Sequence, residues 1–418
     1  MRWLLIGYMF LFIDRPFEVW QWLGDLHVER VYMLITLAAW VMYPNKRWLP
    51  NLQHAAYAAF AMAVILAWIV SPWAEQGQHI VEDWFKIVVF YVLLVTTIHD
   101  EEGLKHVAAG FLAVMGLYLL HSLREYIGGR FTFRMGISRM IGVDSTLGDP
   151  NSFGASIVFS LPIMMALWKS GIGGKYSKPM LAGYFALSCL CILLTGSRSS
   201  LIGLVVWCMI AIWGTRYRFL AFSGFLVAAP LAFMALPEEL QTRFETVVNP
   251  EVGPANAEES RQGRIVGFTK GMELWEMFPM TGIGPGAWRP ATGSAIESHN
   301  LYGQLLGETG TLGGISFLSI LVCFWMNLRA MRRDRKRNPE RRDDLIYTLS
   351  SSVTLSLFLL LFMGNFGHNL WRFTWLWYGG FLIVARHCVT VRAAEAWDAE
   401  PEPEPEPLPE GWVLHSPH

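Results

Sequence analysis

The segment TLGGISFLSILVCFWMNL, residues 311–328, decides the class of fold. It contains no charged residue, and the strongly basic segment 329–342 follows it directly. A membrane-spanning helix needs about 20 mostly apolar residues, and Lys and Arg are concentrated in cytoplasmic loops. The segment therefore predicts a transmembrane helix whose C-terminal end faces the cytoplasm.

The composition extends this interpretation to the whole chain. Of its 418 residues, 53% are apolar and only 16% are charged, whereas soluble domains have about 25% charged residues. The formal net charge of −1 provides no positive field for a nucleic acid. We predict an all-α, polytopic integral membrane protein with about twelve transmembrane helices. The predicted apolar cores are 3–13, 31–43, 53–70, 84–98, 104–121, 152–168, 180–196, 199–213, 219–236, 311–328, 346–364 and 373–388.

The loop charges predict how these helices are oriented. If 329–342 is cytoplasmic, the other basic loops, at 46–47, 169–178 and 216–218, fall on the same side, and both termini are cytoplasmic. We therefore predict a transmembrane domain over 1–392 and a disordered, acidic, Pro-rich cytoplasmic tail over 393–418. The segments expected on the outer face, opposite the cytoplasm, are 124–151, the junction at 197–198, 365–372, and one long loop, about 237–310, that carries short helices.

The basic residues expected on the outer face are almost all arginine. They comprise one Lys, at 270, and twelve Arg, at 15, 30, 124, 130, 134, 139, 198, 243, 261, 264, 289 and 372. Guanidinium groups bind phosphate oxygens through two hydrogen bonds and stay charged when partly desolvated, which predicts a phosphate-bearing ligand. Contact with lipid headgroups is the alternative for any single arginine. Arg198 joins two apolar segments with almost no loop between them, and a charge so close to hydrocarbon favours function.

Two motifs lie towards the end of the long loop. Glycines at 282, 284 and 286 predict a tight turn that returns the chain to the membrane, and no flanking strand supports a dinucleotide site. Asn300, Gln304 and Glu308 recur at helical spacing and predict a polar stripe. We expect Ser298 to cap this helix and His299 to lie in its first turn, where the helix dipole favours a neutral imidazole that can accept a proton.

Four stretches of sequence resemble the O-antigen ligase and polymerase superfamily of bacterial membrane glycosyltransferases. They are TGSRSS at 195–200, GR at 263–264 followed by PMTGIGPG at 279–286, SHNLYGQLLGETGTLG at 298–313, and DPNSFG at 149–154. The resemblance implies an all-helical bundle with a lateral opening for a polyprenyl chain. It also implies glycan transfer from undecaprenyl pyrophosphate to an acceptor hydroxyl, such as lipid A-core, at the periplasmic face of the inner membrane.

The resemblance also implies roles for single residues. Arg198 and Arg264 match the family's donor-binding arginines, and His299 matches the histidine proposed as the base. The further candidates are Arg289, Asp149, Asn151, Asn300, His368 and Arg372. Two arginines can neutralise the charge that develops on a leaving pyrophosphate, and no Asp-x-Asp pair occurs on the predicted outer face. We therefore expect inverting transfer without a metal or other cofactor, with the donor, the acceptor and membrane lipids as partners.

Several related functions fit the same residues. A ligase attaches a finished polymer to a lipid acceptor, a polymerase extends a lipid-linked chain by repeat units, and a protein O-oligosaccharyltransferase uses a protein hydroxyl. We favour the ligase slightly, because one long loop dominates the predicted outer face. A transporter of a lipid-linked solute is the alternative from another class, but the sequence has no clear inverted repeat and no mid-membrane charges.

Overall fold

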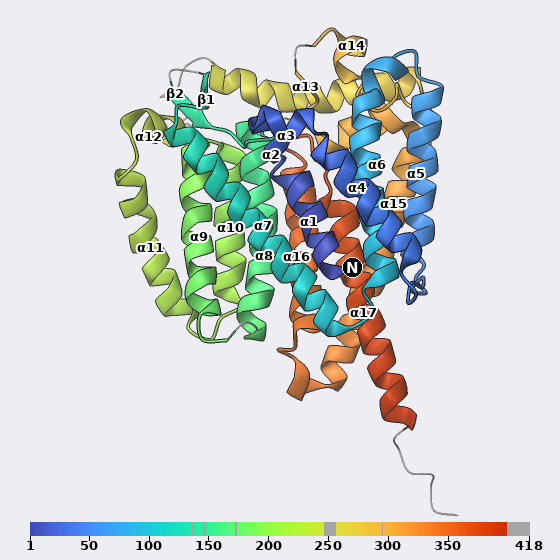
Figure 1. The fold of residues 1–418 in the computed structure, drawn as a ribbon. Coiled ribbons are helices and arrows are strands. Elements are labelled where there is room, and N and C mark those ends of the chain that lie inside the picture. Colours follow the sequence, from blue (N-terminus) through green and yellow to red (C-terminus); the bar gives the residue numbers. More distant parts are fainter. Residues whose placement is uncertain (135–136, 145–147, 172–173, 246–255, 295, 399–418) are drawn as a thin grey trace, which may run out of the picture.

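The protein is a bundle of helices with a cap of shorter elements at one end (Figure 1). The computed structural model describes residues 1–134, 137–144, 148–171, 174–245, 256–294 and 296–398. The bundle comprises α1 (Arg2–Ile13), α4 (Val28–Met42), α5 (Gln53–Ile69), α6 (Ala74–Thr97), α7 (Glu101–Ile127), α8 (Pro150–Ser170), α9 (Ser177–Leu194), α10 (Arg198–Trp213), α11 (Arg218–Met234), α15 (Leu301–Arg337), α16 (Leu345–Met363) and α17 (Thr374–Asp398).

The cap contains most of the remaining elements. They are α2 (Pro16–Val19), α3 (Gln21–Asp25), β1 (Phe131–Arg134), β2 (Ile137–Met140), α12 (Glu238–Glu245), α13 (Asn256–Met277) and α14 (Trp288–Thr292). In Figure 1, α13 and α14 lie across the upper end, and α17 leaves the lower end. A 3-10 turn, η2 (Pro339–Arg341), lies between α15 and α16 within the basic segment.

Each of the twelve predicted apolar cores coincides with one bundle helix. By length and composition, five helices among the described residues can cross a membrane, namely α7, α8, α9, α15 and α16, and α5, α10 and α11 are apolar but shorter. The helical class is confirmed, and the number of spans stays a prediction. The antiparallel hairpin β1–β2 was not expected, and α17 continues to Asp398, past the predicted boundary at 392. The predicted tail from 399 onwards lies outside the described residues.

Helix α8 lies at the centre of the bundle. Of its most apolar window, 83% is buried inside the protein, against 22% for the peripheral α9. It packs along α16, and the buried Tyr378 of α17 donates a hydrogen bond of 2.8 Å to the carbonyl of Phe159. Because α8 is held on several sides, its N-terminal end is a fixed platform at the capped end of the bundle.

Helix α15 is broken at Gly310, which has φ 62° and ψ −162°. A break leaves carbonyls of the preceding turn without their helical partners. The glycine turn at 282–286 supplies these partners, because Ile283 N–H donates to Gly307 O (2.9 Å) and Gly284 N–H donates to Glu308 O (3.0 Å). A side chain at Gly282, whose φ is +66°, would collide with the α15 backbone. The predicted tight turn is confirmed, and it docks the cap against the broken helix.

Candidate active site

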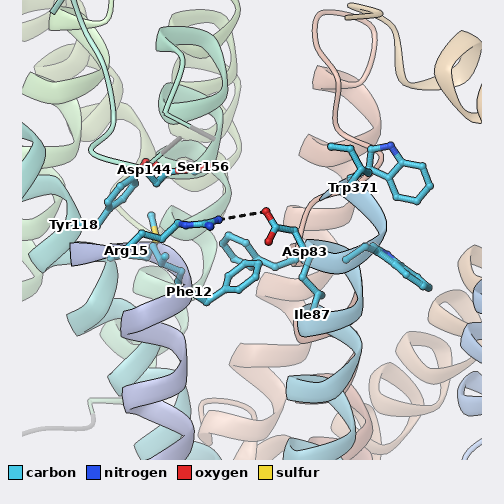
Figure 2. A pocket seen from close by; sticks show the side chains of 13 residues that line it. Phe12, Arg15, Asp83, Ile87, Tyr118, Asp144, Ser156 and Trp371 are labelled. Atoms are coloured by element: carbon cyan, nitrogen blue, oxygen red, sulfur yellow. Dashed lines mark hydrogen bonds and ion pairs between the residues drawn. The ribbon is translucent and has the colours of Figure 1, made fainter. Parts of the chain in front are cut away.

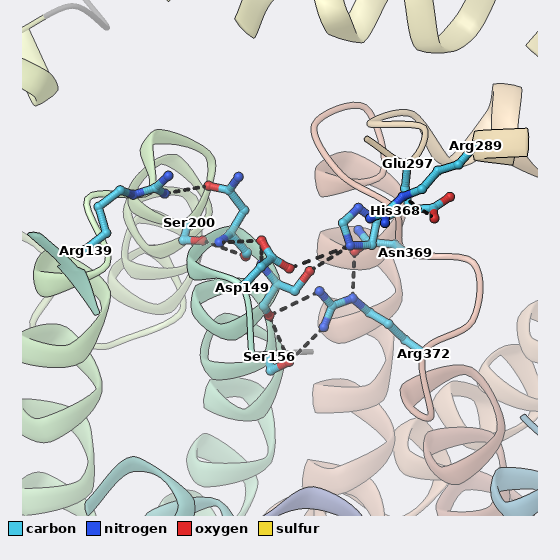
Figure 3. Close-up of polar contacts among 11 residues, drawn as sticks. Arg139, Asp149, Ser156, Ser200, Arg289, Glu297, His368, Asn369 and Arg372 are labelled. Carbon is cyan, nitrogen blue, oxygen red and sulfur yellow. Dashed lines mark hydrogen bonds and ion pairs between the residues drawn. The ribbon is translucent and has the colours of Figure 1, made fainter. Parts of the chain in front are cut away.

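Asp149 begins helix α8 and also faces His368. Its carboxylate accepts the backbone N–H groups of Asn151 (3.0 Å) and Ser152 (3.2 Å), as an N-cap does. Its Oδ2 lies 3.7 Å from His368 Nε2, which is also 3.0 Å from the Ser152 hydroxyl (Figure 3). Burial raises the pKa of Asp149, but His368 and Ser152 more than reverse this and hold the pKa below its usual range. Asp149 is therefore anionic at neutral pH beside His368.

Arg198 is the first residue of α10, directly after the predicted junction. Ser197 caps this helix by accepting the N–H of Ser200. The buried Arg139 holds the junction to α8, because its Nε donates to Thr195 O (2.8 Å) and its Nη2 donates to Asn151 Oδ1 (3.0 Å). The N-terminal ends of α8 and α10 therefore lie side by side, with Arg198 half-buried between the cap and the bundle.

Arg264 is brought to the same place by close contact between α13 and α15. A Cβ added to Gly271 would lie 2.2 Å from Gly303 O, so the two helices touch through their backbones. Gly267 lies against the backbone of His299, and Arg264 precedes Gly267 by three residues on the same side of α13. Burial and the charge of Arg198 both lower the pKa of Arg264. The two arginines, from separate segments, are therefore near enough for their charges to repel each other.

The predicted capping around His299 is wrong in one respect. Asn300, not Ser298, caps α15, because its Oδ1 accepts the N–H groups of Tyr302 and Gly303, both at 3.0 Å. Ser298 instead accepts the N–H of Asn300 at 3.3 Å. His299 therefore lies one residue before the cap of α15 and not in its first turn. Asn caps helices as well as Ser does, so the sequence alone could not choose between them.

His299 and His368 line one small cavity. Their ring centroids are 5.7 Å apart. Met363 and Ala155 contribute its apolar wall, and the other lining residues are Asn151, Ser152, Ser199, Phe366, Gly367, Asn369 and Arg372. The Arg264 guanidinium lies 5.0 Å from the centre of the Phe366 ring, and Ser199 follows Arg198 in sequence. Arg198 and Arg264 do not line the cavity themselves, but each adjoins a residue that does, whereas His299 is part of the lining.

Arg372 forms the buried floor of this cavity. Its side chain donates to Asn369 Oδ1 (2.8 Å), Ser156 Oγ (2.8 Å) and Ser152 O (3.1 Å). Burial lowers the pKa of Arg372 to about 10, so the guanidinium stays charged at neutral pH. Its donors hold the segment that carries His368 against α8, which makes Arg372 a positioning residue.

Two further candidates lie outside the cavity lining. Arg289 is more than half exposed, and its Nε forms an ion pair of 2.9 Å with Glu297 at the rim (Figure 3). Burial raises the pKa of Glu297, and the charge of Arg289 partly opposes this. The side chain of Asn300 is occupied by capping α15.

A second cavity, of about 40 Å³, lies between α1, α6, α7 and α8 (Figure 2). Aromatic side chains form much of its wall, and Arg15 crosses it to pair with Asp83 at 3.3 Å. Arg15 has φ 47°, in the left-handed region. Ser156 lines this cavity and also accepts from Arg372. Ser156 and Arg372 therefore lie between the two cavities.

Sequence reasoning did not find the contact between Asp149 and His368 or the role of Arg139. The Asp-Pro pair at 149–150 is an N-cap followed by proline at the first helical position, and could have predicted the start of α8. Glycines at 263, 267 and 271 repeat every fourth residue, a pattern typical of closely packed helices. This pattern could have predicted the contact of α13 with α15.

Comparison with known proteins identifies the central segment. Residues 183–318 match the family model described as O-antigen ligase. The matched segment contains Arg198, Arg264 and His299, whereas Asp149, His368 and Arg372 lie outside it. No curated protein matches the chain. This segment of the chain, residues 183–318, is therefore similar to the O-antigen ligase family.

Proposed function

We propose that the protein transfers a glycan from undecaprenyl pyrophosphate to an acceptor hydroxyl at the periplasmic face of the bacterial inner membrane. The convergence of Arg198 and Arg264 carries the proposal. Two like charges in a half-buried site destabilise each other unless an anion lies between them. Helices α8, α10 and α15 also begin around the cavity, and the positive ends of helix dipoles favour anions. A pyrophosphate supplies the charge that this arrangement can stabilise.

A row of phenylalanines supports a lipid-linked donor. Phe366 lies beneath Arg264, its ring is 5.5 Å from that of Phe362, and Phe362 stacks on Phe358 at 6.0 Å. Phe358 is 48% exposed on the side of α16. The row leads from the arginines to a surface that faces lipid in the predicted topology. A prenyl chain attached to the pyrophosphate has an apolar path along it.

The chemistry is a displacement at the anomeric carbon. The acceptor oxygen forms a bond to C1 of the glycan, the C1–O bond to the pyrophosphate breaks, and the acceptor proton passes to His299. The pyrophosphate leaves with the bonding electrons, and Arg198 and Arg264 stabilise its charge. A positioned base contributes about 10²–10⁴ in rate. His368, beside the anionic Asp149 and next to His299, is placed to take the proton onwards. Direct displacement inverts the anomeric centre and needs no metal.

The acceptor decides between three members of this reaction class. We favour a ligase that uses lipid A-core or a similar acceptor, with the repeat-unit polymerase and the protein O-oligosaccharyltransferase as alternatives. All three require the same donor site and the same base. The fold and the site residues are common to them, so acceptor preference has to be measured directly.

The test is transfer from a radiolabelled undecaprenyl pyrophosphate-linked glycan by purified protein in liposomes, without nucleotide or ion gradient. We expect label on lipid A-core, abolished by Arg264→Ala and His299→Ala. Lys270→Gln, an exposed site on the same helix as Arg264, is the matched control and should retain activity. Label that crosses the bilayer while still attached to its carrier would indicate a transporter and contradict the proposal.

A further inference from the structure

A groove between α15 and α16 lies away from the candidate active site. It has a volume of about 400 Å³. Leu321, Leu357 and Leu361 lie along its apolar wall, and Arg329 and Arg332 lie at its other end. The two arginines are exposed and three residues apart on one helix, so they share a face. The groove is therefore apolar along its length and positive at one end.

The length of the groove matches one leaflet of a bilayer. From Leu321 to Arg332 the helix advances by about 16 Å, at 1.5 Å per residue. The hydrocarbon region of one leaflet is about 15 Å thick. Trp325 lines the groove next to Arg329, whose guanidinium lies 5.1 Å from the centre of the Trp325 ring. Tryptophan and arginine are typical of the level at which hydrocarbon meets headgroups. The positive end of the groove thus lies at headgroup depth.

We propose that this groove binds an anionic glycerophospholipid of the leaflet at the basic end of the bundle. Its acyl chain lies along Leu321 and Leu357, and its phosphate is held by Arg329 and Arg332. A basic pocket between membrane helices is suited to an anionic headgroup. Phosphatidylcholine would bring its own ammonium group towards the two guanidiniums and is disfavoured. A polyprenyl chain that enters from the candidate active site has no negative group to place at this end.

The test uses the full chain in detergent and native mass spectrometry with added phosphatidylglycerol or phosphatidylcholine. Two arginines near the headgroup level favour the anionic lipid by about tenfold or more. The double variant Arg329→Gln/Arg332→Gln should bind both lipids equally. Arg333→Gln/Arg341→Gln removes the same charge from exposed residues that do not line the groove, and should keep the preference.

A second variant tests the apolar part of the groove without changing the charge of the protein. Leu321→Trp fills the apolar part and leaves both arginines in place, so it should weaken phosphatidylglycerol binding at least tenfold without changing the charge. Equal binding of the two lipids by the parent protein would overturn the proposal. The proposal would also be overturned if Arg333→Gln/Arg341→Gln lost the preference for phosphatidylglycerol to the same extent as Arg329→Gln/Arg332→Gln. Displacement of phosphatidylglycerol by undecaprenyl phosphate would overturn it as well. None of these outcomes depends on glycan transfer.

Discussion

Replacing Arg264 by Gln should separate donor binding from stability. The Arg264 guanidinium lies 5.0 Å from the centre of the Phe366 ring, and the charge of Arg198 repels it. Losing the cation–π contact lowers the free energy of unfolding by about 0.5–1 kcal/mol. Removing the repulsion between the two arginines raises it. We therefore expect the melting temperature without ligand to stay within about 2 °C of the parent. Losing charge-assisted hydrogen bonds to a pyrophosphate costs about 1.5–3 kcal/mol, or roughly 10- to 150-fold in affinity.

The assay is binding of undecaprenyl pyrophosphate to purified protein in nanodiscs, together with thermal unfolding with and without this ligand. The parent should be stabilised by the ligand, and Arg264→Gln should lose that stabilisation at the same concentration. Lys270→Gln, which removes a charge from an exposed position on the same helix, should behave as the parent. If Arg264→Gln binds undecaprenyl pyrophosphate within threefold of the parent, the two arginines do not form the donor site.

The other predictions concern the histidines, Asp149, metal and topology. His299→Ala should lower turnover by about 10²-fold or more with nearly normal donor binding, and His368→Ala should cost less; the reverse order in turnover assays would make His368 the base. Because the pKa of Asp149 is depressed in the folded protein, its ionised form contributes stability above about pH 4, where an unfolded Asp ionises, and this is lost at lower pH. Asp149→Asn keeps a capping side chain and should therefore lose stability at pH 7, and this loss should become progressively smaller as the pH falls below about 4, as measured by unfolding over that range. Transfer should survive EDTA, and loss of activity that Mg²⁺ restores would count against the arginines. An impermeant thiol reagent added to intact cells should label Asn256→Cys but not Arg335→Cys in a background without the native cysteines, and the opposite pattern would invert the topology.

Most of the bundle could be predicted because its signal is local. An apolar run of helical length identifies a helix without knowledge of its neighbours, and each of the twelve predicted cores fell on one helix. The ends of helices and strands were harder to predict than their existence. The helix predicted from 311 begins directly after the non-helical Gly310, and a shorter helical segment that is capped by Asn300 precedes the break. The hairpin β1–β2 consists of two strands of only four residues each, which are too short to give a strong pattern in the sequence.

The site could be predicted only in part, for a similar reason. Arg198, Arg264 and His299 were identified from motifs, but their convergence depends on long-range packing between α13 and α15 through glycines. The Asp149–His368 pair joins segments that are far apart in the chain. No periodicity in either segment predicts such a contact, since a single salt bridge leaves no repeated pattern in the sequence.

The polar stripe that was predicted on α15 forms a buried hydrogen-bond network around Glu308. Gln304 and Glu308 were predicted to share a face, and Gln304 Nε2 donates to Glu308 Oε1 at 3.1 Å. The other carboxylate oxygen accepts from Gly286 N–H and from the Trp371 indole N–H, both at 3.0 Å. Trp371 adjoins Arg372, which holds the segment of His368 against α8, and Gly286 belongs to the turn that fills the break in α15. A buried carboxylate with three donors is costly to disturb. Glu308 therefore joins the cap to the segment that carries His368, and fixes the site from behind without touching a substrate.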